Sequence, residues 1–237
     1  MIVKLHTTTS TMKDAAALAS RSEPHGTAVI ADLQTAGIPV HFVGSSDGIP
    51  SPDLIASANT ASEGHSGYRI RDIINDLDGD VSDPAVAGDN GGYWFSRAEQ
   101  PDIILLHIGS NDMIHGVVGG LDDPTTASGR LDTLIGKIFQ LKPNVKLVVS
   151  TLIPVNTTPQ QEALLVNYNN AIRTQVVPKY QAAGYAISLV DMYAQFVNPD
   201  GSLKPGLIGD GVHPTPTGYD LMADTWASAV EPLYTPE

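Results

Sequence analysis

A carboxylate and an imidazole lie three residues apart in a short polar loop near the end of the chain. The tract GDGVHP at residues 209–214 contains Asp210 and His213, bounded by glycine and proline. At this spacing the carboxylate can accept a hydrogen bond from Nδ1 of the imidazole, and Nε2 is then free to act as a base. A surface loop with an aspartate cap and an incidental histidine would have the same sequence. The pattern therefore indicates acid–base chemistry, with a structural role as its alternative.

A carboxamide follows an apolar run in the middle of the chain. The run DIILLHIG at residues 102–109 leads into Asn111, within the tract HIGSND. A side-chain amide just beyond a buried strand is a good hydrogen-bond donor to a developing oxyanion. The alternative is an Asn–Asp turn that caps the next segment, and on this feature alone the turn is favoured.

A glycine opens a predicted helix between the second and third apolar runs. In EGHSGYRI, residues 63–70, Gly67 precedes a helical pattern. Glycine lets a backbone N–H approach a ligand closely, and the start of a helix attracts negative charge. Taken alone, a helix-start turn with Ser66 as the N-cap is the favoured interpretation.

The elements that must position these residues can be read from the apolar pattern. Five apolar runs predict strands, at residues 2–5, 40–44, 102–109, 146–153 and 185–190. Each run is rich in leucine or β-branched residues and lacks strict polar alternation, which is typical of strands buried on both faces of a parallel sheet.

Amphipathic segments lie between these runs. Apolar residues recur at helical spacing in five places, at residues 29–36, 70–77, 131–138, 164–176 and 219–230. The alternation predicts a three-layer α/β/α sandwich with a five-stranded parallel sheet and right-handed crossovers. No linker stands out, so we expect a single domain over residues 1–237. In such sheets ligands bind beyond the carboxyl ends of the strands, which is where Asn111 is expected.

Composition excludes several classes of function. The net charge of −13 argues against nucleic acid, whose phosphates require lysine and arginine. The absence of cysteine excludes disulfides, zinc–thiolate sites and a cysteine nucleophile. No apolar run approaches the length of a membrane span, so no membrane partner is expected. No signal-peptide pattern occurs at the start of the sequence, which leaves cytoplasmic and secreted locations open. The oligomeric state is not predicted.

Oxygen-rich tracts raise the question of a metal. The loop at residues 78–92 holds four aspartates, Asp78, Asp80, Asp83 and Asp89, which are hard donors that suit calcium. Their spacing matches no EF-hand, and a solvated polar loop is favoured. The Asp-x-x-His pair offers two metal ligands, but no third or fourth ligand lies at a spacing that is typical of metal-binding motifs. We therefore expect neither a metal nor an organic cofactor.

Together and in this order, the motifs resemble the SGNH hydrolase family, the GDSL-type esterases. That family places a serine nucleophile after the first strand, then a glycine, then Gly-x-Asn-Asp, and finally Asp-x-x-His. Here the last three blocks match Gly67, Gly109–Asp112 and Asp210–His213. The acetylxylan-esterase-like members are the most similar subgroup, on the tracts FVGS (42–45), EGHSGY (63–68) and DGVHPTPTGY (210–219). The resemblance covers roughly residues 26–230 and implies a flavodoxin-like fold.

The first block departs from the family pattern. The first apolar run leads into HTTTSTMKD (6–14), and no Gly-Asp-Ser occurs anywhere in the chain. Counting back from the end of the second predicted strand makes Ser10 the best positional match, with Thr8 and Thr9 in place of the glycine and aspartate. Ser10 is favoured because the base needs a partner hydroxyl. Two alternatives stay open: Thr9 or Thr11 supplies the hydroxyl, or the site is impaired.

The resemblance implies a serine esterase that acts on a small ester. Ser10 would attack the carbonyl, His213 would act as the base, and Asp210 would hold the imidazole tautomer. The oxyanion would be held by the backbone N–H groups of Ser10 and Gly67 and by the side chain of Asn111. Acetyl groups, including those on carbohydrates, are the expected acyl groups. The alternative function is a catalytically impaired module that binds carbohydrate or lipid.

Overall fold

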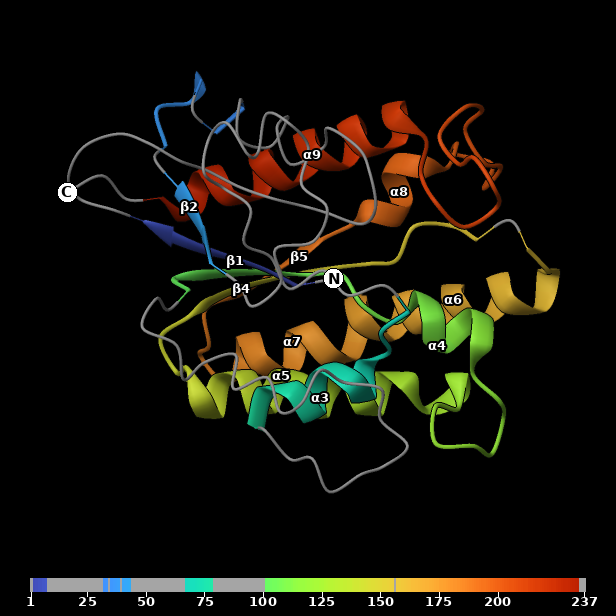
Figure 1. Cartoon of the computed structure of the whole chain (residues 1–237), viewed down its shortest axis with the longest axis horizontal. Coiled ribbons are helices and arrows are strands. Elements are labelled where there is room, and N and C mark those ends of the chain that lie inside the picture. Colours follow the sequence, from blue (N-terminus) through green and yellow to red (C-terminus); the bar gives the residue numbers. More distant parts are fainter. Residues whose placement is uncertain are drawn as a thin grey trace.

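The computed structural model describes residues 2–7, 32–33, 35–38, 40–43, 67–78, 101–155 and 157–234. Within these residues, five strands form one sheet in the order β2-β1-β3-β4-β5 (Figure 1). The strands are β1 Ile2–Thr7, β2 Val40–Val43, β3 Ile103–Leu106, β4 Lys146–Ser150 and β5 Ile187–Val190. Each strand overlaps one of the apolar runs that predicted it.

The direction of β1 contradicts the predicted all-parallel sheet. β3, β4 and β5 are parallel to one another, with Ile104 opposite Leu147. β1 is antiparallel to both of its neighbours, with Ile2 opposite Leu106. An apolar run predicts burial, but parallel and antiparallel ladders both satisfy the backbone of a buried strand, so the pattern does not fix its direction. The carboxyl end of β1 therefore lies at the edge where β3 begins.

Two layers of helices cover the sheet, which confirms the α/β/α sandwich (Figure 1). One face carries α3 Ile70–Asp78, α4 Ser110–His115, α5 Ala127–Leu141, α6 Pro159–Ala171 and α7 Val177–Ala182. The other face carries α8 Met192–Phe196 and α9 Pro216–Val230. Short helical turns add η1 Pro124–Thr126, η2 Ile172–Val176 and η3 Glu231–Leu233.

The central strand β3 contributes side chains to both cores. Ile104 and Leu106 pack in the core beneath α3 to α7, whereas Ile103 and Leu105 pack in the core beneath α8 and α9, beside Trp226. All four β3 side chains are buried. Successive side chains of a strand point to opposite faces, so a strand covered on both faces has no polar position. This explains the continuous apolar run.

The fourth predicted helix is interrupted by a wider turn. α6 passes into the π-helical segment η2, which leads directly into α7. Pro178 stands near the start of α7, and its missing N–H and its ring prevent a regular α-helical turn there. The chain stays helical as far as Ala182, and the N–H of Gly184 then donates to the carbonyl of Gln181.

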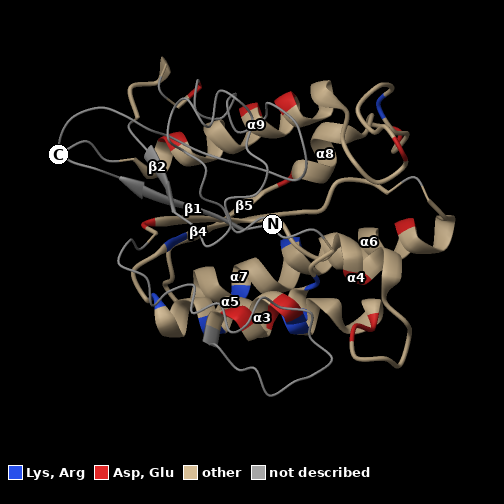
Figure 2. Cartoon of the chain, viewed as in Figure 1, with Lys and Arg blue, Asp and Glu red and all other residues tan. Residues whose placement is uncertain are grey.

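Charge is distributed differently over the two helical layers. α9 carries Asp220 and Asp224 but no lysine or arginine, whereas α3 and α5 carry side chains of both signs (Figure 2). The charged groups of the α3–α5 layer can therefore pair with one another. None of the helices in the described part of the chain is long and apolar enough to span a membrane.

Candidate active site

Asp210 and His213 form the hydrogen-bonded pair that their spacing predicts. Nδ1 of His213 lies 2.7 Å from Oδ2 of Asp210. The other carboxylate oxygen, Oδ1, accepts from the backbone N–H of His213 at 2.7 Å and from that of Val212 at 3.0 Å. These three bonds orient the carboxylate toward the ring. With Nδ1–H donating, Nε2 of the imidazole carries a lone pair that can accept a proton.

The loop that carries this pair is anchored to the start of α9. The N–H of Gly209 donates to the carbonyl of His213 at 2.9 Å, which closes the loop on itself. Thr215 caps α9 and its hydroxyl donates to the carbonyl of Gly206 at 2.6 Å. Although the side chains of His213 and Asp210 are 66% and 62% exposed, the backbone beneath them is therefore held in place.

Asn111 lies against the segment that begins with Gly67. Its Nδ2 donates to the carbonyl of Tyr68 at 3.0 Å. A carboxamide nitrogen carries two hydrogens, so this bond leaves one N–H that can donate to a further acceptor. Gly67, the residue before Tyr68, has a φ of 84°, a conformation that favours glycine. The structure therefore joins the second and third sequence blocks through one hydrogen bond.

The turn into α4 requires glycine at position 109. Gly109 has a φ of 123°, and a Cβ added there would lie 2.9 Å from Cε1 of Tyr168. Tyr168 is itself fixed, because its hydroxyl donates to the carbonyl of Ile108 at 2.9 Å. The ring and the glycine thus set the point at which the chain leaves β3 and presents Asn111.

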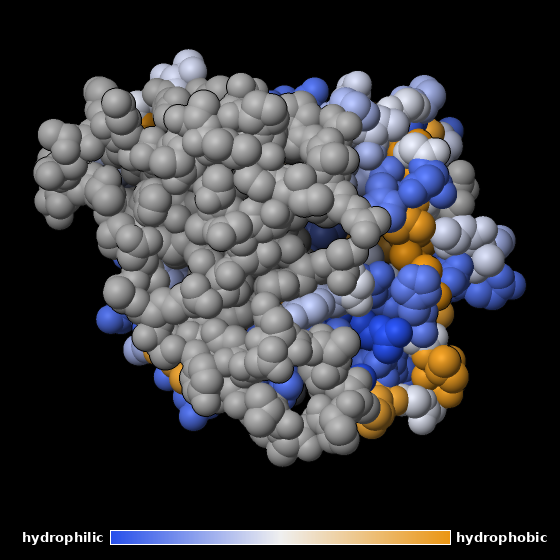
Figure 3. Space-filling model, viewed as in Figure 1, coloured by the Kyte–Doolittle hydropathy of each residue, from blue (hydrophilic) through white to orange (hydrophobic). Residues whose placement is uncertain are grey.

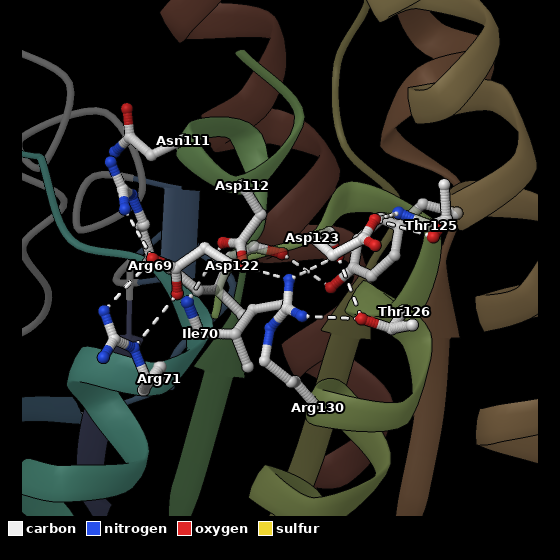
Figure 4. A network of polar contacts seen from close by, with 12 residues as sticks. Arg69, Ile70, Arg71, Asn111, Asp112, Asp122, Asp123, Thr125, Thr126 and Arg130 are labelled. Carbon is white, nitrogen blue, oxygen red and sulfur yellow. Dashed lines mark hydrogen bonds and ion pairs between the residues drawn. The ribbon is translucent and has the colours of Figure 1, made fainter. Parts of the chain in front are cut away.

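A buried ion pair lies directly beside Asn111 (Figure 4). The side chain of Asp112 is fully buried, and its Oδ1 accepts from Nη2 of Arg130 at 2.8 Å. Its Oδ2 accepts from the backbone N–H of Ile70 at 3.1 Å. Arg130 also donates to the carbonyl of Asp123 at 2.9 Å and to Oγ1 of Thr126 at 3.0 Å.

A second ion pair links the same segments from the other side. Arg69 and Arg71 both donate to the carboxylate of Asp122, and the two bonds from Arg71 measure 3.1 Å (Figure 4). The N–H of Arg69 also donates to Oδ2 of Asp72 at 2.7 Å, which satisfies a donor at the start of α3. The segment after Gly67 is therefore held by charged groups on two sides.

The pKa values of these carboxylates follow from their surroundings. The backbone N–H of His213, its imidazole and the N–H of Val212 hold the pKa of Asp210 well below its usual range. Burial raises the pKa of Asp112, and the hydrogen bonds from Arg130 and Ile70 act in the opposite direction. Asp210 is therefore a carboxylate at neutral pH, as a partner for an imidazole must be.

A second histidine lies at the carboxyl end of β3 but has a different environment. Nδ1 of His107 lies 2.7 Å from Oγ of Ser150 at the end of β4. Burial lowers the pKa of His107 to about 3, so its ring is neutral. Ser150 is 2% exposed, which keeps its hydroxyl away from solvent. This contact is a hydrogen bond that links the ends of two neighbouring strands.

The structure brings together some of the predicted site residues. It pairs Asp210 with His213, and it places Asn111 against the residue that follows Gly67. The loop before α9 and helix α4 lie at the same end of the sheet, beyond the carboxyl ends of the parallel strands (Figure 1). Ser10 lies outside the described residues, as do Thr9 and Thr11.

The aspartate-rich loop at residues 78–92, where calcium is the less favoured interpretation, also lies outside the described residues, apart from the backbone of Asp78 at the end of α3. Within the described ranges, no group of three or more His, Asp or Glu side chains could hold a metal ion.

Sequence reasoning missed Arg130 and Asp122. Arg130 directly precedes the amphipathic segment 131–138 and Asp122 lies in the polar tract before it, and charge at such positions usually indicates a solvated surface. The available signal was Asp112, because an acidic residue directly after a buried strand requires a partner if it is buried itself. The sequence contained no indication of which cation would supply that partner.

Apolar side chains are exposed in the turn that follows α4. Val117, Val118 and Leu121 are 70%, 69% and 67% exposed. Hydrophobic surface is visible at this end of the molecule among hydrophilic groups (Figure 3). The N–H of Gly119 donates to Oδ2 of Asp123 at 2.7 Å, so the turn is internally bonded. The polar network and an apolar surface therefore adjoin each other.

Comparison with known protein families matches residues 35–221 to the GDSL-like lipase/acylhydrolase family. The chain belongs to this family. The SGNH or GDSL-type assignment made from the order of the motifs is thereby confirmed. The match ends beyond His213 and begins after Ser10, so it contains the glycine, Gly-x-Asn-Asp and Asp-x-x-His blocks but not the atypical first block.

One of the two curated relatives is an esterase by name, and the other is named as a putative endoglucanase. A multidomain esterase of Ruminococcus flavefaciens is 26% identical over 172 residues, which are 71% of this chain and 20% of that protein. The second, putative endoglucanase X of Acetivibrio thermocellus, is 30% identical over 62% of this chain and 57% of its own length. The matched region therefore covers a fifth of the first curated relative and somewhat over half of the second.

Solved structures show the same fold. A family 3 carbohydrate esterase from Clostridium thermocellum superimposes with a TM-score of 0.61 at 26% identity, over 88% of this chain and 86% of the other. A family 3 carbohydrate esterase from Talaromyces cellulolyticus gives a TM-score of 0.63 at 22% identity, over 86% and 87%.

Proposed function

We propose that this GDSL-family protein hydrolyses short-chain carboxylic esters, with acetyl esters of carbohydrates as the preferred class. The observation that carries the proposal is the 2.7 Å contact between Nδ1 of His213 and Oδ2 of Asp210. It fixes the tautomer that leaves Nε2 as a base, in a chain whose family hydrolyses acyl esters. The relatives named as carbohydrate esterases support the substrate class.

The reaction follows from the groups at the carboxyl end of the parallel strands. A hydroxyl attacks the ester carbonyl while Nε2 of His213 removes its proton, and negative charge develops on the carbonyl oxygen. The remaining N–H of Asn111 Nδ2 and the backbone N–H of Gly67 stabilise that charge. The imidazolium then returns the proton to the departing alcohol, and an acyl-enzyme is left. Water attacks in a second round that uses the same base, and carboxylic acid is released.

Ser10 is the first nucleophile to test, on the position of its block in the sequence. The assay follows p-nitrophenyl acetate hydrolysis by the wild type and by Ser10→Ala, Thr9→Ala and Thr11→Ala. We expect Ser10→Ala alone to lose activity, by at least about a thousandfold, because removing any member of a triad has an effect of this size or larger. Undiminished turnover in Ser10→Ala would eliminate Ser10 as the nucleophile.

His213→Ala tests the base independently of the nucleophile. Its matched control is His115→Ala, because His115 is an exposed histidine in α4 that makes none of the contacts of the site. We expect His213→Ala to be inactive and His115→Ala to retain wild-type turnover. Acetate release from acetylated xylan, compared with release from unsubstituted alkyl acetates, tests the substrate class. Equal rates on both substrates would argue against a carbohydrate preference.

The direction of β1 favours a second candidate function, a carbohydrate- or lipid-binding module without catalysis. Thr7, the last residue of β1, lies at the edge of the sheet opposite to the one at which β3 leads into Asn111. Thr7, after which the block with Ser10 follows in the sequence, therefore lies away from the end of the sheet where Asn111 is presented. A wild-type protein that binds xylo-oligosaccharides by calorimetry, yet hydrolyses none of the short acyl esters, would establish this function. Hydrolysis that depends on His213 would eliminate it.

A further inference from the structure

Two adjacent side chains of α4 hold one short segment of backbone. Asn111 Nδ2 donates to the carbonyl of Tyr68 at 3.0 Å, and Oδ2 of Asp112 accepts from the N–H of Ile70 at 3.1 Å. The two contacts lie two residues apart on the segment that begins with Gly67. That segment and the Asn111 amide carry the two oxyanion donors that lie within the described residues. Their relative position is therefore set by the residue pair 111–112.

Asp112 can hold Ile70 only if its charge is compensated. Its side chain is fully buried, and Arg130, itself 15% exposed, supplies the cation at 2.8 Å. A buried carboxylate that loses its partner is strongly destabilised and tends to move or to take up a proton. Arg130 is fixed in turn by the carbonyl of Asp123 and by Oγ1 of Thr126. The position of Asp112 is thus determined from a third segment, on η1 and α5.

The same third segment also holds the Gly67 side of the site. Asp122, which precedes Asp123, accepts from both Arg69 and Arg71. The contacts form a closed ring from Asn111 and Asp112 to Arg130, onward to the 122–123 turn, and back to the segment after Gly67 (Figure 4). Apart from Asn111 itself, no member of this ring needs to touch a substrate for the ring to fix where the donors point.

We propose that Asp112 and Arg130 are positioning residues for ester hydrolysis, which set the Asn111 amide and the Gly67 N–H at the separation that one oxyanion requires. This rests on the proposed esterase function, because without an oxyanion the separation has no consequence. Donors act on the charge that develops in the transition state, and a displacement of about 1 Å removes much of their effect. Loss of either residue therefore lowers kcat while KM changes little.

The test substitutes Asp112→Asn, Arg130→Lys and Arg130→Met, and measures kcat and KM for p-nitrophenyl acetate together with thermal unfolding. We expect Asp112→Asn and Arg130→Met to lower kcat by about 10- to 100-fold, somewhat less than complete loss of a donor. Arg130→Lys keeps a cation beside Asp112 and should recover part of the loss. The control is Asp132→Asn, which breaks the exposed pair of Asp132 with Lys179 on α5 and α7 and should leave kcat unchanged.

A double-mutant cycle separates positioning from simple stabilisation. Each substitution is combined with Asn111→Ala, which removes the donor outright. If Asp112 and Arg130 act through that donor, the double variants should turn over within about threefold of Asn111→Ala alone, because coupled residues are not additive. Effects that multiply in full would overturn the proposal, as would a loss of stability with wild-type kcat. If Asp112→Asn does not fold, the two Arg130 variants complete the cycle.

The failure of this proposal differs from failure of the esterase function. If the wild type and His213→Ala hydrolyse the ester at the same rate, the esterase function is wrong and the positioning role is refuted with it. If His213→Ala is inactive but the Asp112 and Asn111 effects multiply, only the positioning role is refuted.

Discussion

Asp210→Asn is the sharpest perturbation of the acid–base pair, because it preserves the shape of the side chain while it removes the negative charge and replaces one acceptor oxygen with a donor N–H₂. In the wild type, Oδ1 of Asp210 accepts from the backbone N–H groups of Val212 and His213, while Oδ2 faces Nδ1 of the ring. An asparagine keeps the two backbone bonds through its oxygen and so directs its N–H₂ at Nδ1. The ring must then carry its proton on Nε2, and the base is lost.

The expected loss in kcat follows from this change of tautomer and from the solvent exposure of the Asp210 and His213 side chains. The same substitution in a buried Ser-His-Asp site lowers kcat by about 10⁴. Here the two side chains are 62% and 66% exposed, so water can solvate the ring in its basic tautomer and soften the penalty. We therefore expect a loss of about a thousandfold in kcat, which corresponds to about 4 kcal/mol of transition-state stabilisation.

The assay compares kcat for p-nitrophenyl acetate in Asp210→Asn and in Asp200→Asn. Asp200 is a matched control, since it is an exposed loop aspartate that accepts from the N–H and hydroxyl of Ser202. We expect the control to stay within about twofold of the wild type, as surface substitutions usually do. A folded Asp210→Asn variant that loses less than tenfold would refute the assignment of Asp210 as the residue that orients the base.

Two further predictions concern stability. Gly109→Ala should destabilise the fold by about 1–3 kcal/mol, because a residue with Cβ is strained at a φ of 123° and its Cβ meets Tyr168 at 2.9 Å; an unchanged urea midpoint would contradict this. Burial, with the nearby Asp132, raises the pKa of Tyr180 to about 12. Its neutral hydroxyl donates to the carbonyl of Asp132 at 2.7 Å, so its contribution is complete below about pH 10 and is lost as the pH rises through 12. Tyr180→Phe should therefore show a smaller fall in Tm over this range than the wild type, and parallel Tm curves would contradict the assignment.

The apolar pattern was sufficient to predict the strands and most of the helices, because burial on one or two faces leaves a periodic record in the sequence. β3 shows why, since four consecutive apolar residues serve two cores. The pattern failed for the direction of β1, because a buried run is equally apolar in either orientation. It also did not predict the π-helical segment, where Pro178 alters one turn without ending the helix.

The candidate site likewise has contacts that could be predicted from the sequence and contacts that could not. Asp210 and His213 could be predicted because their contact depends on a spacing of three residues. The contact of Asn111 with Tyr68 joins residues far apart in the chain, and the family's order of motifs was needed to associate them. The role of Arg130 could not be predicted, because its partner Asp112 becomes buried only when the folded chain brings it to Ile70 and Arg130. Ion pairs between residues far apart in the chain produce no periodic pattern in the sequence.

The two halves of the site also differ in how many residues separate the partners of their hydrogen bonds along the sequence. Asp210 and His213 are 3 residues apart in the sequence, whereas Asn111 and Tyr68 are 43 residues apart. The entropy of closure grows with the intervening length, so the short contact can form in a chain that has not yet folded, and the long one requires assembled tertiary structure. A misfolded copy could therefore keep an imidazole paired with its carboxylate and yet lack any means of stabilising an oxyanion. Ester turnover would accordingly report the native fraction of a preparation.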